Sequence, residues 1–162
     1  MLNNYLKPVL YFIPLAVIQL VLVPLISIDN VAPNFILILV VYYTLRNGQI
    51  FGMLLGFGLG FIFDLISGGL IGAFMFSFTV SAFVTGFFYN ENKFDTNLAS
   101  YFFLVILFVS SFVCLFIFGS ISNSSTNIGF LFLIVEEGIL PAIYTTLFGI
   151  LLVVFSSKKG LQ

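Results

Sequence analysis

Long apolar stretches separated by short polar turns dominate this sequence and leave it few possible folds. Of its 162 residues, 61% are hydrophobic and 7% are charged, whereas a typical soluble domain is about 25% charged. So few charges cannot cover the surface of a water-soluble fold of this size. We therefore expect an integral membrane protein, in which about 20 apolar residues form each membrane-spanning helix.

Charged and turn-forming residues divide the chain into six expected crossings within a single membrane domain, residues 1–162. The predicted crossings are residues 8–26, 32–45, 48–66, 70–89, 98–118 and 139–155. We interpret the first as an uncleaved crossing, because no small-x-small cleavage site follows it. Residues 129–135 are expected to form an interfacial or re-entrant piece, since Glu136 and Pro141 interrupt an apolar stretch that is long for one crossing. One tilted helix is the alternative.

The basic residues predict an orientation. With six crossings, all five of them fall on one side: Lys7, Arg46, Lys93, Lys158 and Lys159. Positive residues in short loops stay in the cytoplasm, so both termini are expected there. One crossing more or fewer would move some of these residues to the other side, and the charges therefore also support the count of six.

The composition excludes several classes of function. The net charge of −1 provides no basic surface for nucleic acid. Without histidine, and with Cys114 as the single cysteine, the chain cannot form a disulfide or a Cys/His metal site. Glu136 and Glu137 resemble the start of an intramembrane protease motif, but Pro141 stands where that motif has Arg. We expect no enzyme, no cofactor and no metal.

A glycine repeat marks the third expected crossing. Gly48, Gly52, Gly56 and Gly60 recur every four residues, and Asp64 takes the next place. Small residues at this spacing let another helix backbone approach closely. Each step of four rotates about 40° around the helix, which favours a crossed partner. Two alternatives are open: packing against neighbouring helices of the same chain, or contact with a helix of another protein.

Acidic residues mark the expected outer side. Asp64 lies about 24 Å along the helix from Gly48, near the outer edge of a roughly 30 Å hydrocarbon core. One alternative is a solvated or capping carboxylate at a helix end that bonds Ser67 or the Gly68 and Gly69 amides. The other is an anchor for a partner protein. Glu136 and Glu137 form a second outer pair, for which interfacial solvation and partner binding are both open.

Residues 32–72 resemble one known family. The second expected crossing begins Ala-Pro-Asn-Phe-Ile-Leu-Ile at Ala32 and later carries a Tyr-Tyr pair. Gly-Phe-Gly-Leu-Gly-Phe-Ile-Phe-Asp-Leu-Ile-Ser-Gly then runs from Gly56 to Gly68, with Gly72 beyond. This pattern, together with the length and the six expected crossings, resembles the MreD family of bacterial rod shape-determining proteins.

The resemblance implies a non-enzymatic subunit of the cell-wall elongation complex in the bacterial inner membrane. It implies a compact six-helix bundle similar to the substrate-binding subunits of energy-coupling-factor transporters. The implied partners are MreC, a RodA-type glycosyltransferase with its transpeptidase and, indirectly, MreB filaments. Membrane lipid is a further expected partner of so apolar a chain.

Two functions from different classes follow. The first is a scaffold that binds the transmembrane and juxtamembrane segment of MreC. Its candidate partner-binding residues are Pro33, Asn34, Gly52, Gly56, Gly60, Asp64, Ser67, Gly68, Gly72, Glu136 and Glu137. The alternative is a small-molecule-binding subunit of an energy-coupling-factor-type transporter, with the polar members of this set lining an outer pocket. A pore is disfavoured because no helix presents a polar face.

Overall fold

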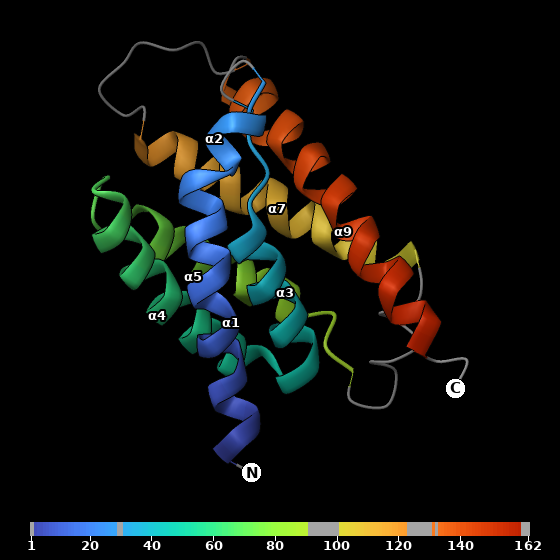
Figure 1. Ribbon diagram of the computed structural model, residues 1–162. Helices are drawn as coiled ribbons and strands as arrows, with labels where there is room; N and C mark the ends of the chain where they lie inside the picture. Colours follow the sequence, from blue (N-terminus) through green and yellow to red (C-terminus); the bar gives the residue numbers. More distant parts are fainter. Residues whose placement is uncertain (1, 29–30, 91–100, 123–130, 132, 160–162) are drawn as a thin grey trace.

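The computed structural model describes residues 2–28, 31–90, 101–122, 131 and 133–159, which form a bundle of helices (Figure 1). In chain order the helices are α1 (Leu2–Val21), α2 (Val23–Ile26), α3 (Phe35–Asn47), α4 (Gln49–Ser67), α5 (Ala73–Gly86), α7 (Tyr101–Ser122), the π-helix η2 (Leu133–Ile139) and α9 (Leu140–Lys159). An isolated bridge joins Ile28 to Val31. The expected all-helical class is confirmed for this part of the chain.

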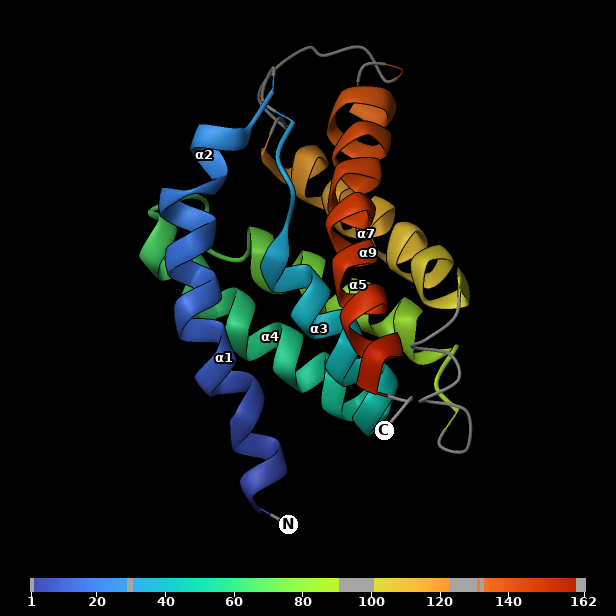
Figure 2. The same ribbon diagram turned by 45° about the vertical axis from the view of Figure 1, so that its right-hand side comes forward.

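Helix α3 lies at the centre of the bundle. It contacts α1, α4, α5, α7 and α9, while α4 packs on α5, α5 on α7, and α7 on α9. Helix α1 begins and α9 ends at the same end of the bundle, the lower end in Figures 1 and 2. Helix α2 and the start of α9 lie at the opposite end.

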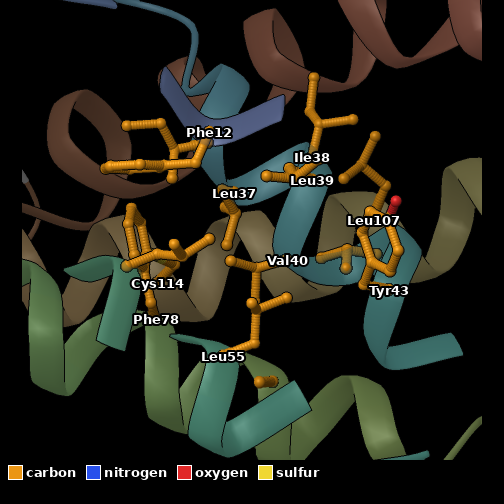
Figure 3. Packing of buried hydrophobic residues seen from close by; sticks show 14 of the residues in the cluster. Phe12, Leu37, Ile38, Leu39, Val40, Tyr43, Leu55, Phe78, Leu107 and Cys114 are labelled. Carbon is orange, nitrogen blue, oxygen red and sulfur yellow. The ribbon is translucent and has the colours of Figure 1, made fainter. Parts of the chain in front are cut away.

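The apolar core surrounds α3. Nine of the 13 residues of this helix are buried, as expected for a helix that is hydrophobic on every face. Around Leu37 and Val40, Figure 3 shows side chains from four other helices, namely Phe12, Leu55, Phe78 and Leu107. The apolar run that follows Asn34 therefore forms the interior of the protein, with other helices between it and the surroundings.

In the part of the chain that the structure describes, three segments are long and apolar enough to cross a membrane: Gln49–Ser67, Tyr101–Ser122 and Ile134–Leu151. Helices α3 and α5 are shorter, with 13 and 14 residues, or about 20 Å at 1.5 Å per residue. The second and fourth crossings were expected to begin at residues 32 and 70, but these helices begin at Phe35 and Ala73. Both begin late because the chain before them is held in a non-helical form by side chains described below.

The expected interruption near Pro141 takes another form. Helical turns run without a break from the π-helix η2 into α9, so the chain does not stop at Glu136. Proline lacks the N–H that an α-helix requires, and it clashes with the carbonyl four residues before it. The wider π turns that precede Pro141 accommodate this defect. Of the expected piece 129–135, residues 129, 130 and 132 lie outside the described part.

The glycine repeat packs against helices of the same chain. A Cβ atom at Gly56 would lie 2.8 Å from the Phe78 carbonyl oxygen of α5, and one at Gly60 would lie 2.6 Å from Met75 Cα. A Cβ at Gly52 would overlap Thr44 of α3. These glycines therefore let α4 approach α3 and α5 more closely than any side chain would allow. Gly58, on another face, has nothing within 4 Å.

We predict that Gly60→Ala destabilises the protein, because the new methyl group meets the α5 backbone, which cannot move without separating two helices. The expected loss of unfolding free energy is about 1 to 3 kcal/mol, as for other overpacked sites. Titration with sodium dodecyl sulfate, followed by circular dichroism, measures it. Gly58→Ala is the control and should leave stability equal or higher. Equal stability of the two variants would contradict the packing described here.

Candidate functional site

Helix α3 begins inside the protein. The chain descends from the end near α2 as an extended segment, residues 31–34, which passes between α1 and α9 (Figure 2). Pro33 is buried and Asn34 is 4% exposed. Extended backbone surrounded by apolar groups exposes N–H and C=O groups that have no helical partner, and leaving them unpaired is costly.

The Gln19 side chain of α1 satisfies two of these backbone groups. Its amide nitrogen donates to the Pro33 carbonyl oxygen at 2.9 Å, and its amide oxygen accepts from the Phe35 N–H at 2.9 Å. One side chain thus pairs a carbonyl before α3 and an amide in its first turn. This pairing ties α1 to the point where the extended segment becomes helical.

Asn34 and Thr145 complete the start of α3. The Asn34 side-chain oxygen accepts from the Leu37 N–H at 3.0 Å, which makes Asn34 the N-cap residue. The Asn34 N–H donates to the Thr145 hydroxyl of α9 at 3.0 Å. The start of α3 is therefore held by side chains from α1 and α9 as well as by its own cap.

The start of α5 depends on Asp64 of α4. The N-cap position of α5 is Gly72, which has no side chain to serve as a cap. Its φ of 101° favours glycine. The Asp64 carboxylate accepts from the N–H groups of Gly72, Phe74 and Met75 at 2.9, 3.1 and 3.1 Å. It thereby replaces the missing cap and places negative charge at the positive end of the α5 dipole.

The capping interpretation of Asp64 was right about the role and wrong about the partners. The carboxylate is 1% exposed and bonds the first turn of α5 rather than the Gly68 and Gly69 amides. Ser67 donates to the Asp64 main-chain carbonyl at 3.3 Å instead. Gly68 ends α4 with a φ of 67°, and the close packing of α4 on α5 brings the carboxylate to the α5 backbone.

The candidate residues fall into three groups with different neighbours. Gly52, Gly56, Gly60, Asp64 and Gly72 lie together along α4 and α5, while Pro33 and Asn34 lie between α1 and α9. Glu136 is exposed and Glu137 is half-buried on η2. A Cβ at Gly119 of α7 would lie 2.7 Å from Glu137 Cβ, so Gly119 gives this glutamate its room.

The sequence interpretation missed Gln19 and Thr145 as residues of this site. A lone amide in the apolar stretch of α1 was a usable signal for Gln19, because polar side chains at membrane depth have partners. No feature of the sequence distinguishes Thr145 from Thr146, the next residue. Only the fold shows that the Thr145 hydroxyl faces α3.

Other buried polar side chains serve helix packing. The Ser81 hydroxyl donates to the Ser110 carbonyl oxygen at 2.8 Å, and the Thr85 and Ser110 hydroxyls are 2.7 Å apart, which joins α5 to α7. Among the described residues, no three His, Cys, Asp or Glu side chains could hold a metal ion together.

The described residues form an all-helical fold with helices apolar enough to span a membrane, in which side chains of other helices hold the starts of two short helices. The model of one family, described as rod shape-determining protein MreD, matches residues 1–159. The chain belongs to the MreD family, whose members are membrane proteins of rod-shape determination, and the resemblance of residues 32–72 is confirmed. Comparisons with curated proteins and with solved structures found no match.

We predict that Thr145→Val destabilises the protein and Thr146→Val does not. Valine keeps the shape of threonine but leaves the buried Asn34 N–H without an acceptor, at a cost of about 1 to 3 kcal/mol. Thr146 bonds only the Ala142 carbonyl of its own helix, which makes it the matched control. Unfolding in sodium dodecyl sulfate measures both variants, and equal midpoints would show that the Thr145 bond contributes nothing.

Proposed function

We propose that the protein is a non-enzymatic scaffold of the bacterial cell-wall elongation complex. In this proposal it binds the transmembrane and juxtamembrane segment of MreC and helps position a RodA-type glycosyltransferase and its transpeptidase, with MreB filaments acting indirectly. Membership of the MreD family supports a role in rod-shape determination. The observation that carries the mechanism is the buried Asp64 cap, which fixes the turn between α4 and α5.

We further propose six crossings of the inner membrane with both termini in the cytoplasm. The start of α1 and the end of α9 lie at the same end of the bundle, which supports an even number of crossings (Figure 1). Lys7 and Arg46 line the same groove toward that end, in agreement with the positive-inside rule. The extended segment 31–34 and the turn at residues 68–72 complete the crossings that α3 and α5 are too short to make alone.

The proposed MreC surface is the outward face of α4. Four large side chains recur along it at helical spacing and are exposed: Leu54, Phe57, Phe61 and Leu65. Gly58 lies beside them with open space above it, so a partner helix can approach the α4 backbone there. Lipid tails are as apolar as leucine, and close contact of this kind is a main source of helix association in membranes.

Most candidate residues then act by positioning this surface. Gly52, Gly56 and Gly60 set the distance of α4 from its neighbours, and Asp64 fixes its outer end. Ser67 and Gly68 are exposed at the outer turn, where a juxtamembrane segment would pass. Glu136 is exposed on η2 and offers that segment a charged contact.

Copurification tests the scaffold proposal. We predict that tagged protein extracted in mild detergent recovers MreC, and that Gly58→Phe lowers the recovery at least about tenfold, because a bulky ring blocks the close approach. Val105→Phe, which enlarges an exposed residue of α7, is the matched control and should change nothing. Size-exclusion chromatography checks that both variants are folded.

Two results would overturn the scaffold. One is recovery of MreC at the level of the unaltered protein with both Gly58→Phe and Asp64→Leu, since the first removes the contact and the second its support. The other is recovery of an ATPase module with a bound vitamin-sized ligand, which would assign the protein to the transporter class.

Cysteine labelling tests the orientation. In a Cys114→Ser background, Ser67→Cys should react in intact cells with a maleimide that cannot cross the inner membrane, because Ser67 is exposed at the proposed outer end. Arg46→Cys should react only after lysis. The reverse pattern would invert the proposed topology.

A further inference from the structure

A groove of about 700 Å³ lies between α1, α3 and α9, on a different side of the molecule from the α4–α5 turn. Its walls are mainly apolar, and the polar side chains that line it are Lys7, Tyr11, Tyr42, Tyr43 and Arg46. No described acidic residue lines the groove. Neither the family assignment nor the proposed scaffold gives it a function.

The charges of the groove gather at one end. Lys7 lies near the start of α1 and Arg46 in the last turn of α3, and these two ends share the lower end of the bundle (Figure 1). Tyr11 and Tyr42 lie one helical turn inward from them, and Arg46 donates to the Tyr42 hydroxyl at 3.4 Å. Cationic side chains and hydroxyl groups are the groups with which proteins bind a phosphate.

The rest of the groove is apolar and is about as long as one leaflet is thick. Eleven residues separate Lys7 from Ile18 on α1, and eleven separate Phe35 from Arg46 on α3. At about 1.5 Å per residue this is about 16 Å, or half of a roughly 30 Å hydrocarbon core. Phe35 and Phe148, an edge-to-face pair whose ring centres are 5.0 Å apart, line the groove away from the cations.

The lining of the groove, with two cations at one end and an apolar wall along the rest, matches the charged head and apolar tail of a lipid. A flexible hydrocarbon chain is thin enough to enter. We propose that the groove binds one anionic phospholipid, with the phosphate at Lys7 and Arg46 and an acyl chain along α3 toward Phe148.

The headgroup provides the selectivity of this site. An acyl chain gains little by leaving other lipid tails for an apolar wall, because the two surroundings are equally apolar. Each cation near an anionic lipid favours it by a factor of about five, so the pair favours an anionic over a zwitterionic lipid by roughly thirtyfold. The apolar channel makes the bound molecule a lipid and not free phosphate.

Competition between lipids tests the proposal. The purified chain is supplied with equal amounts of phosphatidylglycerol and phosphatidylcholine that carry the same acyl chains, and native mass spectrometry counts the lipid retained. We expect at least tenfold more phosphatidylglycerol. The double variant Lys7→Gln, Arg46→Gln should bring the ratio to about one, and the charge-preserving control Lys7→Arg, Arg46→Lys should keep it.

Two further measurements test where the lipid binds and whether the site recognises a lipid or a phosphate group alone. Phosphatidylglycerol with a photoreactive group at the end of an acyl chain should crosslink to peptides of α1, α3 and α9, and glycerol phosphate without chains should not displace it. Equal retention of both lipids, a preference that survives the double glutamine variant, or crosslinks confined to other helices would overturn the proposal. Displacement by glycerol phosphate would reduce the site to a phosphate site and would also overturn it. None of these results depends on MreC.

Discussion

Hydrocarbon offers no hydrogen bonds, so every backbone amide and carbonyl inside this protein needs a partner within it. The structure meets this constraint at two places where a helix starts below the surface. At α3 the partners are Gln19, Asn34 and Thr145, and at α5 the partner is the carboxylate of Asp64. These few polar side chains permit the short helices, the extended segment between α1 and α9, and the central position of α3.

The glycine repeat and Asp64 act together. Gly56 and Gly60 bring the α5 backbone within reach of α4, and only this closeness lets an aspartate on one helix cap the next. The cap in turn removes the cost of burying both the carboxylate and the first amides of α5. A close-packing motif and a buried charge, which look unrelated along the chain, are therefore one structural unit. The face of α4 around Gly58 takes no part in this unit, and no atom lies within 4 Å of a Cβ placed there.

The sequence was sufficient for the fold class, the family and the unusual character of Asp64, because composition and short-range spacing carry that information. It predicted six apolar segments, although α3 and α5 start later than expected because Asn34 is held by Thr145 of α9 and Gly72 by Asp64 of the preceding helix. It did not reveal which amides Asp64 bonds, since that choice depends on how α5 folds back on α4. Nor did it reveal Thr145, whose partner lies 111 residues earlier.

The hydrogen bonds that hold the starts of α3 and α5 differ in when they can form during synthesis. Asp64 meets Met75 only 11 residues later, so this bond is available as soon as the hairpin of α4 and α5 has left the ribosome. Asn34 must wait for Thr145, which is made 111 residues later. Until α9 arrives, the Asn34 N–H at the start of the central helix lacks its acceptor. Helix α9 thus completes the start of α3, and the bundle closes only after α9 has been synthesised.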